Sequence, residues 1–571
     1  MNIQGKVKEQ NTFDAIVVGS GISGGWAAKE LTEKGLKTLV LERGRKVEHI
    51  VDYENALKNP WDFPHRGRLS NEDKKAYWAG SRAGFANAED VLPNFVKDSE
   101  HHYEEKRRFD WVRGYQTGGR SLTWGKQSYR WNEKDFLANL EDGHGVDWPI
   151  RYADLAPWYD YVEKFAGISG SLEGLDALPD GVFQPAMEMN CVEKDVKAAI
   201  ESKFPGRKMI IGRAAHLTKP TEEQTALGRG SCQYRNMCKR GCPYGAYFSS
   251  QSATLPAAQK TGNLTIVNDK VVYRVIFDKE TDKAIGVKAI DETSGEELEY
   301  YSKVIFLNAS AMNTAWMMMQ STSSKHPNGL GNESDQLGRN IMDHHLNTAA
   351  RGEVEGYEDQ YYYGRRPNGI YIPRFANFHS DKRDFLRGFG YQGGASRAKG
   401  DTRNMEASFG VELKEAMTKP GPWTFGIRGF GETLPDPNNR MTLSKNKDKW
   451  GLPYIEFDAA WGPNEMKMRE TMVKEAVAML EAAGLKNVKG ENDMEKSPGV
   501  GIHEMGTARM GRDPKTSVLN GWNQVWGAEN VFVTDGAAMA SSSCVNPSLT
   551  YMALTARAAN YAAEELKKGN I

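Results

Sequence analysis

The feature that most constrains this chain is a glycine-rich turn placed directly after a short apolar run. Residues 14–18 form the apolar run, and residues 19–24 follow it as GSGISG, with the spacing GxGxxG. A helical pattern then continues through Leu31, and residues 37–41 have the composition of a second buried strand. This order of strand, turn, helix and strand predicts a βαβ unit at the start of a Rossmann-like α/β domain.

The same turn indicates a dinucleotide ligand. Glycines at these positions let a pyrophosphate approach the backbone amides at the start of the helix. Glu42 lies 23 residues after Gly19, at the end of the second predicted strand, where its carboxylate can accept hydrogen bonds from a ribose. Its negative charge would repel a 2′-phosphate, which argues against NADP. A glycine turn without a ligand is the alternative, and the fingerprint alone does not distinguish FAD from NAD.

Size and charge exclude several other classes of protein. The length of 571 residues predicts several folding units rather than one core. Basic and acidic residues nearly balance, with a formal net charge of −1, so we expect no nucleic-acid partner. No run of 18 apolar residues is present, so we expect no membrane span. Residues 1–13 are polar and lack the apolar core of a signal peptide, so we expect no secretion signal.

Later segments predict a second kind of sheet. Residues 263–307 alternate like strands and end in a buried strand, which predicts a meander. Between residues 346 and 460, short strand-like runs separated by Gly, Pro and Asn predict an antiparallel sheet with one face toward a ligand. An amphipathic helix is expected from Pro463 to near Gly484. Residues 61–110 show only weak periodicity and are interpreted as an irregular excursion.

Several further motifs occur in order along the chain. They are a second glycine turn with hydroxyl side chains at 118–125, the segment from Leu337 to His344, the strand-like segment at 439–444, and the region from His503 to Thr550. With the fingerprint, this set resembles the glucose-methanol-choline (GMC) oxidoreductases, flavoenzymes that bind FAD and oxidise alcohols. Within that family, the segments at 147–157 and 503–511 look most like bacterial sugar dehydrogenases, including the glucoside 3-dehydrogenase group, and pyranose oxidases.

The resemblance implies a GMC fold of two domains. The Rossmann-like FAD domain would comprise residues 1–60, 111–145, 205–345 and 495–571, with a cysteine segment at 231–243. The α+β substrate domain, built on an antiparallel sheet, would comprise residues 146–204 and 346–494. Pyranose oxidases with covalent FAD carry a histidine at the position of Thr123, so the resemblance implies non-covalent FAD here. The expected FAD-binding residues are Gly19, Gly21, Ile22, Ser23, Gly24, Glu42, Arg43, Gly118, Gly119, Ser121, Thr123, Trp124, Val272, Asp535, Gly536, Pro547 and Ser548.

Two residues are expected to carry the chemistry. Oxidation of an alcohol by hydride transfer needs a base for the hydroxyl proton, and histidine is the usual choice. His503 lies in a glycine-flanked turn that matches the GMC active-site motif, whereas a lone histidine without that context would more often be structural. Asn546, followed by Pro547, matches the second active-site position of the family. An asparagine can orient the substrate oxygen but cannot take its proton, so the resemblance implies His503 as the sole base. A simple Asn-Pro turn is the alternative for Asn546.

Three of the five cysteines, Cys232, Cys238 and Cys242, fall within eleven residues in a basic segment. This density indicates a metal site rather than disulfides. Catalytic subunits of FAD-dependent sugar dehydrogenases carry the same spacing around a [3Fe-4S] cluster, and the resemblance implies that iron–sulfur cluster here. Zinc, with His216 or an acid as a further ligand, and free thiols are the alternatives. Cys191 and Cys544 are interpreted as buried thiols.

Substrate and partners also follow from the resemblance. It favours a dehydrogenase of glucose or a glucoside at C3, a small partner subunit, a cytochrome-type electron acceptor, and export to the periplasm with that subunit; a cytoplasmic location is the alternative. Rival hypotheses are an oxygen-using sugar oxidase, a dehydrogenase of gluconate or another polyol, and a non-catalytic flavoprotein. The sequence also contains a group of aromatic residues: Tyr361, Tyr362, Tyr363, Tyr371 and Phe375. They predict a surface on which a sugar ring stacks, and packing in a core is the equal alternative.

Overall fold

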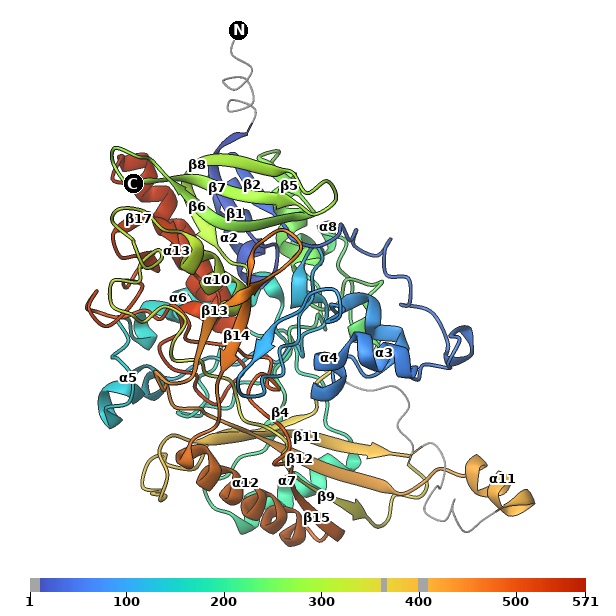
Figure 1. Ribbon diagram of the computed structural model, residues 1–571. Coiled ribbons are helices and arrows are strands. Elements are labelled where there is room, and N and C mark those ends of the chain that lie inside the picture. Colours follow the sequence, from blue (N-terminus) through green and yellow to red (C-terminus); the bar gives the residue numbers. More distant parts are fainter. Residues whose placement is uncertain (1–10, 361–366, 399–408) are drawn as a thin grey trace.

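Two large sheets organise the computed structural model, which describes residues 11–360, 367–398 and 409–571 (Figure 1). In this part of the chain, the larger sheet has eight strands, whose parallel core has the order β17-β8-β1-β2-β5. β16, β7 and β6 extend it by antiparallel pairing. The strands are β1 (Thr12–Val18), β2 (Thr38–Leu41), β5 (Leu264–Val267), β6 (Lys270–Phe277), β7 (Ala284–Asp291), β8 (Glu297–Leu307), β16 (Gln524–Val525) and β17 (Ala528–Phe532).

The predicted βαβ unit is confirmed. β1 pairs in parallel with β2, with Ala15 opposite Thr38, and α2 (Ile22–Glu33) connects them. Ala15 and Val17 face a core that they share with α2 and with α13 (Ser548–Lys568), while Ile16 faces the main core on the other side. Because both faces of the parallel strands are covered, these strands are continuous apolar runs in the sequence. Of the meander predicted at 263–307, β6, β7 and β8 pair antiparallel in succession, whereas β5 pairs in parallel with β2.

The second sheet is antiparallel throughout, as predicted, with the order β15-β9-β12-β11-β10-β4. Its strands are β4 (Ile210–Ile211), β9 (Thr348–Val354), β10 (Ile370–Ile372), β11 (Phe389–Arg397), β12 (Trp423–Gly431) and β15 (Lys486–Asn492). α12 (Pro463–Ala482) and α7 (Cys191–Lys203) cover one face, at the bottom of Figure 1. Met468, Met472 and Met479 of α12 pack there against Phe425 and Ile427 of β12. The other face is left free to border a ligand site.

A three-stranded sheet lies between the two large ones in Figure 1 and consists of β13 (Arg440–Lys447), β14 (Pro453–Asp458) and β3 (Glu104–Glu105). It joins the region predicted as an irregular excursion to residues assigned by sequence to the substrate domain. β4 likewise comes from a segment assigned to the FAD domain but pairs with the antiparallel sheet. Two-residue strands such as β3 and β4 carry no periodic signal, so the sequence could not place them. The domain boundaries therefore stay a prediction.

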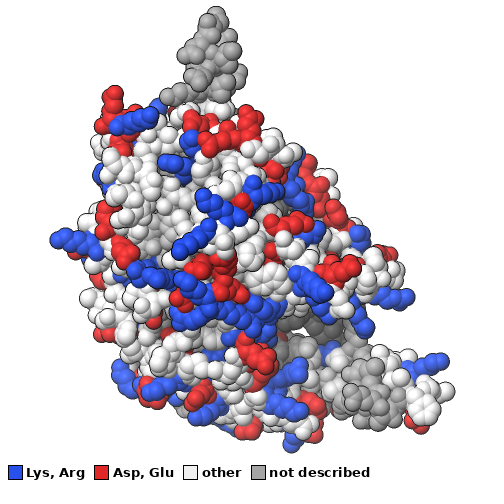
Figure 2. All heavy atoms as spheres, in the orientation of Figure 1, with Lys and Arg blue, Asp and Glu red and all other residues white. Residues whose placement is uncertain are grey.

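The remaining helices fill the space around the sheets. They are α3 (Asn71–Ala76), α4 (Trp78–Ala83), α5 (Glu133–Asp142), α6 (Tyr152–Ala166), α8 (Glu222–Ala226), α9 (Leu255–Lys260), α10 (Ala311–Gln320) and α11 (Gly410–Thr418). Basic and acidic side chains are interspersed on the face drawn in Figure 2. Across the described ranges, no helix combines the length and the apolar character needed to cross a membrane.

Candidate active site

A cavity of about 480 Å³ lies where the end of β1 faces the free side of the antiparallel sheet. Val18 borders it from β1, and Gln392 and Phe430 border it from β11 and β12. Gly24, Gly118 and Pro547 are adjacent in the chain to residues that line the cavity, but they do not line it themselves. The predicted site residues that do line it are Gly19, Gly21, Ile22, Ser23, Glu42, Arg43, Gly119, Ser121, Thr123, Trp124, Val272, His503, Asp535, Gly536, Asn546 and Ser548.

The fingerprint turn leaves room for a ligand where a phosphate would bind. Gly19 has a φ of +92°, and a Cβ there would lie 2.4 Å from the carbonyl oxygen of Asn308. A Cβ on Gly24 would lie 1.9 Å from the carbonyl oxygen of Gly19, so these two glycines are required by the fold itself. Gly21 differs, because its Cβ would meet no atom within 4 Å. Its bare backbone borders the cavity, which fits the close approach of a pyrophosphate.

Glu42 is held at the cavity wall with both carboxylate oxygens already anchored. One oxygen accepts hydrogen bonds from the backbone N–H of Ser20 at 3.0 Å and from its hydroxyl at 2.5 Å, and the other accepts from the N–H of Gly44 at 2.9 Å. Burial raises the pKa of Glu42, while these donors oppose that shift. The hydroxyl of Ser20 also accepts from the N–H of Gly118 at 2.8 Å, which joins the two glycine turns. The cavity wall therefore fits the ribose and pyrophosphate of FAD.

The predicted catalytic pair meets at the other part of the same cavity. Asn546 Nδ2 lies 3.3 Å from His503 Nε2. Gln392 on β11 donates to Asn546 Oδ1 at 2.6 Å, which orients the amide so that its N–H₂ group faces the histidine. A simple Asn-Pro turn does not account for Asn546, because its side chain is positioned against His503.

His344 determines which nitrogen of His503 carries the proton. The Ser543 carbonyl oxygen can only accept, so His344 Nε2, 2.9 Å away, is the protonated nitrogen. Burial lowers the pKa of His344 to about 4, so the ring is neutral and its Nδ1 is an acceptor. His503 Nδ1 lies 2.8 Å from that acceptor and therefore donates. Neutral His503 consequently keeps its lone pair on Nε2, beside Asn546, where a base is needed.

Electrostatics keep His503 neutral. Desolvation in the cavity wall, followed by the neighbouring His344 and the Arg120 guanidinium, lowers the pKa of His503 well below its ordinary value. Arg120 itself forms two hydrogen bonds to the Glu504 carboxylate, at 3.0 and 2.7 Å. This pair links the glycine turn at 118–125 to the turn that carries His503. The Asp343 carboxylate stabilises the turn that carries His503. It accepts hydrogen bonds from the backbone N–H groups of residues 499, 501 and 503 at 2.8, 2.8 and 2.9 Å.

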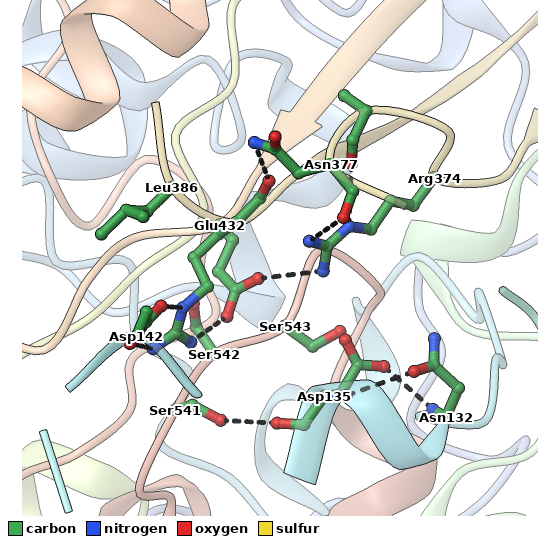
Figure 3. Close-up of polar contacts among 12 residues, drawn as sticks. Asn132, Asp135, Asp142, Arg374, Asn377, Leu386, Glu432, Ser541, Ser542 and Ser543 are labelled. Atoms are coloured by element: carbon green, nitrogen blue, oxygen red, sulfur yellow. Dashed lines mark hydrogen bonds and ion pairs between the residues drawn. The ribbon is translucent and has the colours of Figure 1, made fainter. Parts of the chain in front are cut away.

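The segment 540–546, which carries Asn546, is fixed by a buried polar network (Figure 3). The Ser541 hydroxyl donates to the carbonyl oxygen of Asp135 at 3.3 Å, and the Ser542 hydroxyl donates to that of Thr433 at 3.1 Å. Next to Thr433, Glu432 forms ion pairs with Arg387 at 2.8 Å and Arg374 at 3.9 Å. These contacts connect α5, the end of β12 and the carboxy-terminal segment, so the pair His503–Asn546 has a rigid support.

The three clustered cysteines also come together. Cys232, Cys238 and Cys242 line one small cavity of about 30 Å³, and His216 Nε2 lies 3.6 Å from Cys238 Sγ. Within the ranges that the structure describes, however, no group of three or more His, Cys, Asp or Glu side chains is arranged to hold a metal ion. The predicted cluster is therefore not confirmed. Cys544 is buried as expected, whereas Cys191 is only half-buried at the start of α7.

The predicted aromatic substrate surface receives no support from the structure. Tyr361, Tyr362 and Tyr363 lie outside the described residues. Tyr371 is buried and stacks on Tyr129 at 4.2 Å between ring centroids, and Phe375 packs against the core of the antiparallel sheet. For these two residues, core packing is the outcome. Sequence reasoning also missed His344 and Gln392, although His344 lies in a motif that carried the resemblance.

Comparison with known proteins agrees with this geometry. Two sequence profiles of the GMC oxidoreductases match the chain, the amino-terminal one over residues 13–346 and the carboxy-terminal one over residues 435–555. The chain is 28% identical to 2-methyl-1,2-propanediol dehydrogenase of Mycolicibacterium austroafricanum, over 96% of this chain and 94% of that protein. It is 25% identical to the fructose dehydrogenase large subunit of Gluconobacter japonicus, over 98% and 99%.

A solved structure shares the fold. A variant of Aspergillus oryzae RIB40 formate oxidase, studied for its FAD modification, matches with a TM-score of 0.61 at 15% identity, covering 98% of this chain and 99% of that one. The amino-terminal profile contains the fingerprint turn and His344, and the carboxy-terminal profile contains His503 and Asn546. These are the segments that meet at the cavity. The chain belongs to the GMC oxidoreductase family and is an FAD-dependent oxidoreductase that acts on CH–OH groups.

Proposed function

We propose that this protein is a dehydrogenase that oxidises a secondary hydroxyl group of a sugar. The observation that carries the proposal is the orientation of His503, whose Nε2 lone pair lies beside Asn546 in the cavity that also contains Glu42 and the fingerprint turn. The resemblance described above favours glucose or a glucoside, oxidised at C3. An oxygen-using pyranose-type oxidase and a dehydrogenase of gluconate or another polyol are the alternatives.

His503 and Asn546 have different roles in the proposed reaction. His503 Nε2 takes the hydroxyl proton of the substrate, and Asn546 donates a hydrogen bond that orients the substrate oxygen and stabilises its developing negative charge. FAD, when bound, supplies the acceptor at N5 for the hydride that leaves the same carbon. The substrate thus loses one proton and one hydride and becomes a ketone. By the resemblance described above, Thr123 occupies the position of the histidine that links FAD covalently in pyranose oxidases, so we propose that the flavin is held by non-covalent contacts alone.

An anaerobic titration tests this function. We expect glucose or methyl glucoside to bleach the flavin absorbance of the FAD-loaded protein, because the hydride reaches the flavin and no oxygen reoxidises it. If C3 is the oxidised carbon, 2-deoxyglucose should also bleach the flavin and 3-deoxyglucose should not. A flavin that dithionite reduces but no sugar bleaches would contradict the proposal. Hydrogen peroxide formed in air at the rate of sugar turnover would favour the oxidase.

We further propose that Cys232, Cys238 and Cys242 hold a [3Fe-4S] cluster, which would receive single electrons and pass them to a cytochrome-type acceptor through a small partner subunit. Two observations support this route. The cysteines share one cavity with Tyr247, and Lys126 of the main cavity lies 4.1 Å from the centroid of the Tyr247 ring. The fructose dehydrogenase relative is named as a large subunit, which implies a smaller partner for that protein. Export with such a subunit would bring the chain to the periplasm.

Metal analysis tests the cluster. Purification under anaerobic conditions should yield iron and acid-labile sulfide in the ratio of a [3Fe-4S] cluster. Cys238→Ser should lose the iron and lose turnover with cytochrome c, while sugar still bleaches the flavin, because the hydride step precedes electron exit. Cys191→Ser is the matched control, since this thiol lies outside the cysteine cavity and should leave the iron in place. Zinc in place of iron, or iron that survives in Cys238→Ser, contradicts the assignment.

A further inference from the structure

The free face of the antiparallel sheet presents an arginine to the active site. Along β12, Trp423, Phe425 and Ile427 are buried against the core under α12. Since side chains alternate along a strand, Arg428 and Phe430 point to the opposite face, and Phe430 lines the cavity together with Arg428. The exposed side chain of Arg428 therefore lines this cavity and lies on the face of the sheet opposite α12.

Strand register places this arginine beside the catalytic pair. Arg428 on β12 is directly opposite Gln392 on β11. Directly opposed side chains in an antiparallel pair have Cβ atoms about 5 Å apart. Gln392 donates to Asn546, and Asn546 contacts His503. One residue, Gln392, therefore lies between Arg428 and the Asn546 amide.

No residue that the structure describes supplies a counter-ion to Arg428. The Arg428 side chain forms no hydrogen bond or ion pair with any residue in the ranges that the structure describes. The three carboxylates that line the cavity all have other partners: Glu42 accepts from Ser20, Asp535 from Thr314, and Glu504 from Arg120. The catalytic part of the cavity therefore carries a positive charge without a counter-ion from the described residues.

We propose that Arg428 binds an anionic group of the substrate, so that the enzyme oxidises an acidic sugar derivative in preference to a neutral sugar. The planar guanidinium matches the two oxygens of a carboxylate or a phosphate. A sugar held by its anionic group at Arg428 would present a hydroxyl to His503 Nε2. The inference rests on the proposed alcohol oxidation and deepens it by naming the substrate class.

The test compares neutral and anionic sugars of similar size in the FAD-loaded protein. Apparent dissociation constants are measured by anaerobic stopped-flow bleaching with glucose, glucuronate and glucose 6-phosphate; the last two distinguish a carboxylate from a phosphate. We expect an anionic sugar to bind more tightly than glucose, and added salt to weaken only the anionic sugar. Arg428→Met should raise the ratio of the anionic to the neutral dissociation constant about 10- to 100-fold. Arg428→Lys should recover part of that loss.

Arg351→Met is the matched control. Arg351 is exposed on β9, opposite Gly426 in the same sheet, but it does not line the cavity. Removing it takes away the same charge and should leave the ratio unchanged. If glucose bleaches the flavin and the anionic sugars bind no better, the inference is overturned while the proposed function stands. If no sugar bleaches the flavin, the proposed function fails, and calorimetric titration with glucuronate decides the inference: binding that Arg428→Met weakens supports it, and unchanged or absent binding overturns it.

Discussion

His503→Ala should slow flavin reduction by the substrate about 10²- to 10⁴-fold, the usual contribution of a positioned general base. The reason is that no other group can replace its Nε2: Asn546 cannot accept a proton, and His344 presents its own Nδ1 to His503 rather than to the cavity. The measurement is the limiting rate of anaerobic bleaching in a stopped-flow instrument. A larger loss is expected if Asn546 also moves, because it loses its contact with the ring.

The control for this variant is His379→Ala, which removes an exposed histidine far along the chain from the catalytic turn. It should bleach at the parent rate, and both variants should retain FAD. The pH profile of the parent gives a second check. Because desolvation lowers the pKa of His503, the neutral base persists below the ordinary histidine range, so the rate should stay level down to pH 6.5. Bleaching by His503→Ala at the parent rate would show that the base lies elsewhere.

Gly24→Ala should abolish FAD retention by disrupting the fingerprint turn. A Cβ at Gly24 would lie 1.9 Å from the Gly19 carbonyl oxygen, which is backbone and cannot rotate away. We expect the free energy of unfolding of the apoprotein to fall by about 2–3 kcal/mol, as is typical of overpacked positions. Absorbance of the purified protein measures the flavin content, and denaturant titration measures the stability.

Gly21→Ala separates ligand contact from folding. Its Cβ would meet no protein atom within 4 Å, so the apoprotein should lose less than about 1 kcal/mol of stability. The added methyl group would nevertheless enter the space where the pyrophosphate approaches, so FAD affinity should still fall. If Gly24→Ala is as stable as the parent, or if Gly21→Ala binds FAD with undiminished affinity, the described geometry of the turn is wrong.

Local sequence signals predicted the parts of the fold that depend on neighbouring residues. The apolar run before the glycine turn, the helix after it and Glu42 all lie within about 30 residues, and they form the βαβ unit as predicted. The amphipathic pattern that predicted α12 is likewise local, because every third or fourth residue of a helix faces the same core. The motif order along the chain was sufficient to identify the family, and the matching profiles confirmed it.

The active site needed contacts between residues far apart in the chain. His344 meets His503 across 159 residues, and Gln392 meets Asn546 across 154. Neither pairing has a local signal. The first brings the segment before β9 against the turn at 499–511, and the second depends on how β11 of the antiparallel sheet covers the cavity. Arg428 is an example: the sequence shows one more arginine in a strand, and only the pairing with β11 places it beside the catalytic amide.

The sequence by itself thus determined the family and predicted the cofactor cradle and the base, since these depend on short motifs whose geometry the backbone enforces locally. The tertiary structure decided the protonated nitrogen of His503, the orientation of Asn546 and the position of Arg428 at the cavity. These properties arise only when separate strands and turns converge on one cavity, where burial and hydrogen bonding set the state of each side chain.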